Sequence, residues 1–237
     1  MRDKRKHDQF REIRFANRYN PKVPGSCLVQ QGNTKILCTA TFSDRIPFFL
    51  KEQDSPTGWI TAEYSLLPGS TGNNRIPRER LKSNHRNIEI QRFISRSLRN
   101  TIDLSKIGRR TITIDCDVLE ADGSTRCVSF NGALLSLAQC LRHMVYEHLI
   151  RDLPPILFSS AVSVGITGKD ILLDLDYQED STADSDISVV SSRDERILEV
   201  QTHVERNPLD PKLLNQAVQL ALLRNKEIIA MMEESLR

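Results

Sequence analysis

Apolar and polar residues alternate in two short stretches near the beginning of the chain. Residues 26–31 and 34–42 are rich in apolar side chains at alternate positions, and Gly32 and Asn33 separate them. Two such stretches around a Gly/Asn pair predict a β-hairpin, because both residues accept the backbone of a tight turn. Residues 111–119 (TITIDCDVL) alternate in the same way. The pattern therefore predicts a sheet in the first half of the chain.

The apolar spacing becomes helical in three later stretches. Between residues 88 and 98 the apolar side chains fall on one helix face, and arginines share the opposite face. Residues 128–149 repeat the helical spacing directly after a short polar loop at 121–126. Near the end of the chain, Asp210 and Pro211 supply an N-cap and a first-turn proline for a final helix.

Four more strands are predicted after the break at Pro154 and Pro155. They span residues 158–166, 171–177, 187–191 and 197–202. The segment at 68–83 has no periodicity and is rich in Gly, Pro, Asn and Arg, which predicts a long loop. Strands grouped with strands, with long helices between them, indicate an α+β or mixed α/β fold rather than a doubly wound sheet. The 237 residues, 39% of them apolar, suit a single domain over 1–237.

Composition excludes several classes of protein. The five cysteines are odd in number, widely spaced and contain no CxxC pair, so they predict core residues of a cytoplasmic protein. The charged N-terminus has no apolar export segment, and no apolar run is long enough to span a membrane. Aromatic residues make up only 5% and form no stacking ladder. Phe48, Phe49 and Trp59 could line a groove for one or two bases, although burial in the core is the more common outcome.

The charge is balanced over the whole chain but not locally. Residues 75–110 hold eleven Lys and Arg against three acids, whereas residues 170–186 hold seven acids and no base. A basic stretch can hold a polyanion, and clustered carboxylates can hold a hard divalent cation. This division of charge is typical of an enzyme that acts on phosphates.

The polar loop at 121–126 (ADGSTR) lies where a strand leads into a helix. Backbone N–H groups and the positive helix end would converge there on an anion, to which Thr125 adds a hydroxyl and Arg126 a forked donor. The simpler interpretation is an ordinary helix start, with Ser124 or Thr125 as N-cap and Arg126 on the surface. The loop, which includes Gly123, matches neither the GxGxxG pattern of dinucleotide-binding proteins nor the Walker loop of ATP-binding proteins. A dinucleotide or ATP site is therefore not indicated.

The acidic residues after 178 lie between two predicted strands. A loop there could fold back and direct two carboxylates, Asp180 and Asp186, at one Mg²⁺. The alternatives are a solvated acidic turn, or a structural salt bridge between Asp186 and Arg126.

The basic loop and helix face could follow a phosphate backbone, although a run of charge is often only a solvated surface. The candidate RNA-binding residues are Arg75, Arg78, Arg80, Arg92, Arg96 and Arg99. Arg86 is expected just before the helix, where it would point inward at a site. The histidines, among them His85 and His203, have no spacing that indicates a metal site or a nucleophile pair.

Five segments, in the same order along the chain, resemble the ribonuclease PH family from residue 2 to about residue 201. They are Gly25-Ser26 with Gly32-Asn33-Thr34-Lys35, Gly58 to Tyr64 (GWITAEY), Glu89 to Arg92 with Arg96 to Arg99, Asp115 to Leu119 continuing to Thr125-Arg126, and Glu179-Asp180-Ser181 with Asp186. The resemblance implies a βαβα fold with mixed sheets and packed helices.

The resemblance also implies an activity. The family's enzymes are phosphorolytic 3′-to-5′ exoribonucleases that trim tRNA precursors, release nucleoside diphosphates and can run in reverse. It implies that phosphate, the co-substrate, is held by Arg86 and the loop Gly123, Ser124, Thr125 and Arg126. By the same resemblance, Asp180 and Asp186 would be catalytic and bind Mg²⁺ or Mn²⁺. The chain would form a hexameric ring, built as a trimer of dimers. Its partner would be RNA, especially the 3′ ends of tRNA.

Three departures from the family pattern stand out. Gly69 stands where the family usually has an arginine. Ser188 takes the third position of a segment that is usually Asp-Met-Asn. Thr202 to Arg206 stand where the family usually has small, glycine-rich residues. These changes bear on tRNA contacts, on access to the site and on assembly. The alternative to an active enzyme is a catalytically weak or inactive RNA-binding ring subunit of an exosome-like assembly. A general nucleic-acid-binding module would explain the basic stretch but not the acidic one.

Overall fold

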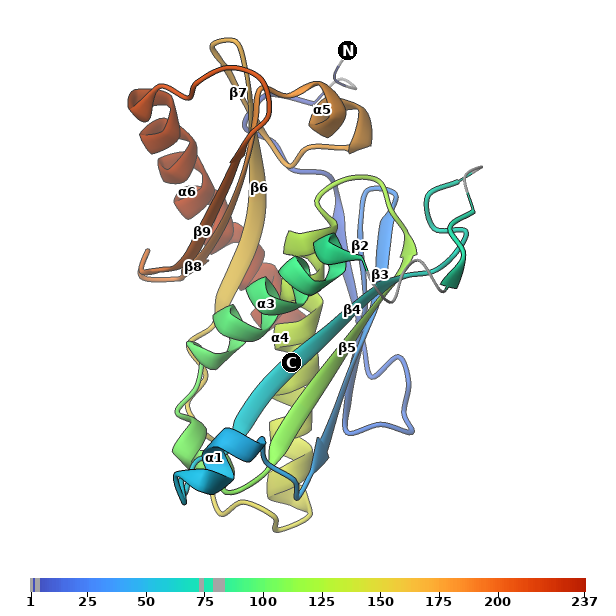
Figure 1. Ribbon diagram of the computed structural model, residues 1–237, viewed down its shortest axis with the longest axis vertical. Helices are drawn as coiled ribbons and strands as arrows, with labels where there is room; N and C mark the ends of the chain where they lie inside the picture. The colour runs from blue at the N-terminus through green and yellow to red at the C-terminus, as the bar shows by residue number, and fades with distance from the viewer. Residues whose placement is uncertain (1, 3–4, 73–74, 79–83) are drawn as a thin grey trace.

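The computed structural model of the chain describes residues 2, 5–72, 75–78 and 84–237. Two β-sheets form the framework, and the long helix α4 (Thr125–Tyr146) packs against both of them (Figure 1). Because α4 is enclosed from two sides, 17 of its 22 residues are buried. Gly132 allows this close packing, since a Cβ there would lie 2.7 Å from the Cys38 sulfur.

The first sheet has five strands and is mixed. In spatial order the strands are β1 (Ile13–Asn17), β2 (Gly25–Gln31), β3 (Thr34–Ser43), β5 (Thr111–Glu120) and β4 (Trp59–Leu66). Neighbouring strands are antiparallel except β4 and β5, which run parallel. Alternate residues such as Ile36, Cys38 and Ala40 are fully buried, so one face of the sheet forms core.

Helix α3 (His85–Arg99) covers edge strand β4 and also contacts α4. Its buried residues include Phe93, Ile94 and Leu98, as expected for an amphipathic helix. The short helix α1 (Phe48–Glu52) and the 3₁₀ turn η1 (Leu104–Ile107) lie in the connections on either side.

The second sheet has four antiparallel strands. Their spatial order is β7 (Asp170–Leu173), β6 (Ser159–Thr167), β8 (Ser185–Ser192) and β9 (Ile197–Val204). Helix α6 (Pro211–Ser235) packs on β6 and β8, and the short helix α5 (Tyr177–Thr182) follows β7. Covered by α4 and α6, β8 is buried at every position except Asp186.

The structure confirms the mixed α/β fold with mixed sheets and packed helices. The hairpin, the helix after residue 84, the long helix after the 121–126 loop and the final helix, capped by Asp210, all form. The five cysteines are buried and unpaired, and burial raises the pKa of Cys127 to about 12. Within the described residues, none of the helices has the length and apolar character needed to span a bilayer.

Other expectations were wrong. The strand predicted at 171–177 ends at Leu173, because Asp174 adopts a left-handed backbone (φ 53°) and turns the chain. The acidic segment after residue 178 is not a simple loop, since part of it forms α5. Burial in the core was also the wrong expectation for Phe48 and Phe49, which are exposed.

Candidate functional site

The described residues form a cleft of about 770 Å³ where the first turns of α3 and α4 meet α5 and the ends of β8 and β9. It is lined by His85, Arg86, Glu89, Arg126, Tyr177, Asp180, Ser181, Ala183, Asp186, His203, Glu205 and Arg206. A smaller recess continues from it to the beginning of α4 and includes Ser124, Thr125 and Ser188. The cleft therefore joins the basic and the acidic parts of the sequence in one place.

The turn before α4 has an unusual backbone. Gly123 (φ 76°) and Ser124 (φ 55°) are both left-handed, and a Cβ on Gly123 would lie 2.3 Å from the carbonyl oxygen of Leu175. The Ser124 hydroxyl does not cap α4, which corrects one of the expectations for this loop. It donates instead to Asp174 Oδ1 at 2.9 Å. The first N–H groups of α4 thus lack a side-chain cap and face the recess.

Arg126 is buried, with only 9% of its surface exposed. It donates through Nη2 to Glu89 Oε1 at 2.9 Å, while its Nε and Nη1 have no hydrogen-bond partner among the described residues. A buried guanidinium with two unused donors is costly unless a ligand satisfies them. The expected surface position of an ordinary helix-start arginine was wrong, and the anion-binding interpretation fits these free donors.

Thr125 is oriented by a neighbour that the sequence did not indicate. The Tyr64 hydroxyl of β4 donates to Thr125 Oγ1 at 2.9 Å, and burial raises the pKa of Tyr64. Arg86 lies within the first turn of α3 rather than before it, because Asn84 is the N-cap. Its side chain lines both the cleft and the recess, close to Thr125 and Arg126.

Asp180 and Asp186 reach the cleft from different elements. Asp180 lies on α5, whose start is fixed by a capping box between Asp176 and Glu179, and Asp186 lies on β8. Burial, and then the charge of Asp180, raises the pKa of Asp186 to about 6. Burial also raises the pKa of Asp180. No salt bridge joins Asp186 to Arg126 in the described part of the chain, since Arg126 pairs with Glu89.

The two carboxylates fit the donor set of Mg²⁺ or Mn²⁺. Oxygen ligands suit these ions, which take one or two protein carboxylates together with water and substrate phosphate. The repulsion that raises the pKa of Asp186 would be relieved by a cation between the pair. Among the described residues, no group of three or more His, Cys, Asp or Glu side chains is placed to hold a metal by itself.

Glu89 connects three segments that are distant in sequence. Its carboxylate accepts from Arg126 and from Gln201 Nε2, and it lies 3.4 Å from His203 Nε2. His203 stands opposite Asp186 in the pairing of β8 with β9. Sequence reasoning used Glu89 only as part of a family motif and gave His203 no role, because nothing in their spacing shows this contact.

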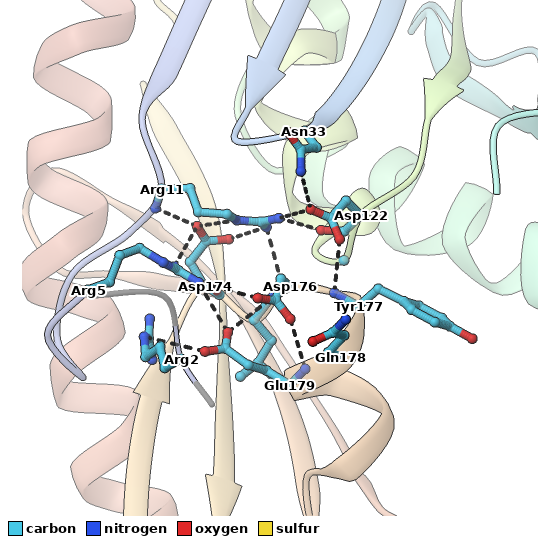
Figure 2. A network of polar contacts seen from close by, with 12 residues as sticks. Arg2, Arg5, Arg11, Asn33, Asp122, Asp174, Asp176, Tyr177, Gln178 and Glu179 are labelled. Carbon is cyan, nitrogen blue, oxygen red and sulfur yellow. Dashed lines mark hydrogen bonds and ion pairs between the residues drawn. The ribbon is translucent and has the colours of Figure 1, made fainter. Parts of the chain in front are cut away.

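An N-terminal clamp holds the acidic side of the cleft (Figure 2). The clamp consists of Arg2, Arg5 and Arg11 with Asp122, Asp174, Asp176 and Glu179. Arg11 donates to Asp174 through Nε at 2.9 Å and Nη2 at 2.7 Å, and its backbone N–H donates at 2.7 Å. Burial would raise the pKa of Asp174, but the hydrogen bonds and charge of Arg11 hold it below its ordinary value.

The predicted RNA-binding arginines have different surroundings. Arg75, Arg78, Arg92 and Arg96 are exposed, whereas Arg80 lies outside the described residues. Arg96 pairs with Glu199. Arg99 lies 4.3 Å above the Trp59 ring and donates to the Ile60 carbonyl at 3.0 Å. The described members of the group therefore do not form one uniform basic stripe.

The three departures from the family pattern also differ in their surroundings. At Gly69, a Cβ would meet no atom within 4 Å. Ser188 is buried in the recess and hydrogen-bonds Cys127. The replaced segment at 202–206 forms the end of β9 and then folds over α5, where Arg206 Nη2 donates to the Ser181 carbonyl at 3.1 Å. Its side chains form one wall of the cleft.

Known families and structures match this architecture. The sequence matches the 3′ exoribonuclease family (RNase PH), domain 1 over residues 9–142 and domain 2 over residues 158–224. Similar solved structures include an archaeal exosome core, 21% identical (TM-score 0.78, 97% of this chain and 89% of that chain). An Archaeoglobus fulgidus exosome with RNA bound to the active site is also 21% identical, with a TM-score of 0.80 over 98% of this chain and 91% of that chain. Rice (Oryza sativa) Rrp46 is 17% identical, with a TM-score of 0.74 over 99% of this chain and 99% of that chain. At these identities the three structures establish a shared fold.

Proposed function

Because this chain belongs to the 3′ exoribonuclease family, RNase PH, we propose that it is a phosphate-dependent 3′-to-5′ exoribonuclease. It would trim the 3′ ends of tRNA precursors, release nucleoside diphosphates, and add nucleotides in the reverse reaction. The observation that carries this proposal is Arg126, which is buried beside the uncapped start of α4 with two unused donors. Inorganic phosphate has the charge and the acceptor oxygens to satisfy them.

The residues around this recess suit an attack by phosphate on RNA. Both reactants are anions, so Arg126 and Arg86 would offset their repulsion and align the attacking oxygen with the phosphorus. Thr125, oriented by Tyr64, would bind a further phosphate oxygen. A P–O bond to the attacking phosphate forms and the bond to the 3′ oxygen breaks. The proton of hydrogen phosphate ends on that oxygen, so the products are a nucleoside diphosphate and a shortened RNA.

The acidic wall would complete the site. Asp180 and Asp186 would hold Mg²⁺ or Mn²⁺, which when bound supplies positive charge for the departing 3′ oxygen. Held on α5 and β8, the two carboxylates line the same recess as Arg86 of α3. Ser188, from the same strand, contributes a hydroxyl to the floor of the recess.

The same proposal includes the substrate and the assembly. The exposed Arg75, Arg78 and Arg92 would guide the RNA backbone toward the cleft. One related structure is described as an exosome with RNA bound to the active site and another as an archaeal exosome core, which supports RNA binding and assembly into an oligomer. We expect a homohexamer built as a trimer of dimers, and light scattering that gives a monomer mass at working concentration would contradict this expectation.

The test is to incubate the protein with a tRNA carrying extra 3′ nucleotides, Mg²⁺ and phosphate, and to identify the released mononucleotide. Nucleoside diphosphates that appear only with phosphate support the proposal, whereas monophosphates contradict it. Arg126→Ala and Asp186→Asn should each lower turnover by at least about a hundredfold. Asp152→Asn, at an exposed position remote from the cleft, is the matched control. RNA binding without any product would favour the alternative, an inactive ring subunit.

A further inference from the structure

Tyr177 is an exposed aromatic residue in the wall of the cleft. It is one of eleven exposed large hydrophobic residues among those described, and 66% of its surface is accessible. The ring borders the same cleft as Arg86, Asp180 and Arg206. Leaving an aromatic ring in water has a cost, and neighbouring cationic groups make this position suitable for a ligand that combines a flat ring with phosphate.

The backbone of Tyr177 is held firmly although its ring is free. Tyr177 is the first residue of α5, and its N–H donates to Asp122 Oδ1 at 3.4 Å. The capping box of α5 fixes Glu179, which Arg5 holds at 3.2 Å. Figure 2 shows the Tyr177 ring directed away from this N-terminal clamp, on the opposite side of α5. The ring is therefore presented on a fixed support, which lowers the entropy cost of binding.

Tyr177 also lies at a defined place relative to the reacting groups. Asp180 follows it by three residues on the same helix, so their Cβ atoms are roughly 5–6 Å apart on one face. In the proposed reaction, the phosphodiester that is attacked lies between Asp180 and Arg126. Because Tyr177, Asp180 and Arg126 line the same cleft, the nucleotide attached to that phosphate has room to place its base against the ring of Tyr177.

We propose that Tyr177 stacks on the base of the 3′-terminal nucleotide of the RNA; this rests on the proposed function. Stacking uses the flat face that every base has, so it does not discriminate between the four bases. An exonuclease that removes successive nucleotides needs this tolerance. Tyr177 would thus position the terminal nucleotide without selecting its sequence.

The experiment uses RNA with 2-aminopurine at the 3′ end, whose fluorescence falls when the base stacks. Binding is measured without phosphate, so that no turnover occurs. We expect the protein to quench this fluorescence, Tyr177→Ala to lose the quenching and bind about 5- to 150-fold more weakly, and Tyr177→Phe to keep both. Tyr146→Ala is the matched control, because Tyr146 is 78% exposed but lines a different cavity.

Two outcomes would overturn the proposal. In one, Tyr177→Ala quenches and binds like the unmodified protein. In the other, Tyr177→Ala changes the mass of the assembly while the 2-aminopurine signal stays the same, which would make Tyr177 a subunit contact. Either result leaves phosphorolysis intact. Absence of nucleoside diphosphate from the unmodified protein would instead contradict the proposed function, so the two failures are distinguishable.

Discussion

Replacing Asp174 with asparagine removes the charge from a carboxylate that has no solvent-exposed surface. Asp174 accepts three hydrogen bonds from Arg11 and one from Ser124, all between 2.7 and 2.9 Å. Asparagine retains one oxygen but turns an NH₂ group toward donors of Arg11 or Ser124. The change therefore leaves the buried guanidinium of Arg11 without its closest counter-charge, and among the described residues only Asp122, at 3.8 Å, stays paired with it.

The expected loss of stability follows from this burial. Removing one partner of a buried ion pair typically costs about 3–5 kcal/mol, because the other charge stays desolvated. For a chain of 237 residues, this corresponds to a fall in Tm of roughly 6–20 °C. Exposed pairs contribute far less, so Asp152→Asn, at a position 85% exposed, should leave Tm nearly unchanged.

Urea unfolding at pH 7 measures the effect, with the fluorescence of the single tryptophan, Trp59, and circular dichroism as independent probes. The midpoint should fall while the slope of free energy against urea stays constant. A loss of less than about 1 kcal/mol, similar to that of Asp152→Asn, would refute the reasoning. It would mean that the Arg11–Asp174 pair does not hold the second sheet to the N-terminal segment.

Three further predictions concern the same region. Acid should destabilise the protein, because the pKa of Asp174 is lower in the folded protein than in the unfolded chain, where it is about 3.9. The Arg11–Asp174 pair therefore contributes its full stability above about pH 3.9 and loses it as the pH falls through the folded-state pKa. A urea midpoint that does not change with pH below about 5 would contradict this. For Asp186 the sign is opposite, because its pKa is raised from 3.8 to about 6 and its charge therefore lowers stability at pH 7. Without metal, Asp186→Asn should raise the free energy of unfolding by up to about 3 kcal/mol, and a decrease measured by urea unfolding would contradict this. Gly123→Ala should lower Tm by at least about 3 °C and raise KM for phosphate, because a Cβ would collide with the carbonyl oxygen of Leu175. Gly69→Ala is the control, since a Cβ there meets no atom within 4 Å. Equal Tm values for the two variants would contradict the close approach of Gly123 to Leu175.

Elements with strong local patterns could be predicted from the sequence, and those made by distant contacts could not. The β2–β3 hairpin follows from Gly32 and Asn33, and α6 from its cap at Asp210. Strand β1 was missed because its five residues carry little alternation and pair with β2 only in the fold. The strand at 171–177 was extended too far because the turn at Asp174 depends on Arg11, 163 positions away.

The candidate site shows the same division. The charge pattern indicated where basic and acidic groups would gather, and the family resemblance selected Arg126 and Asp186 among them. Glu89 escaped notice because its partners come from α4 and β9, and no local pattern joins 89 to 201. Tyr64 was missed for a similar reason, since only the position of β4 places its hydroxyl against Thr125.

The N-terminal clamp also determines when the cleft can form during synthesis. Arg11 leaves the ribosome early, but its partner Asp174 is made 163 residues later. At about 5–20 residues per second, this is a delay of roughly 8–33 seconds. The basic helix α3 is complete well before then, so a growing chain could meet RNA before its carboxylates exist. If the chain has the proposed function, the nascent protein would thus gain an affinity for RNA first and the ability to shorten it last.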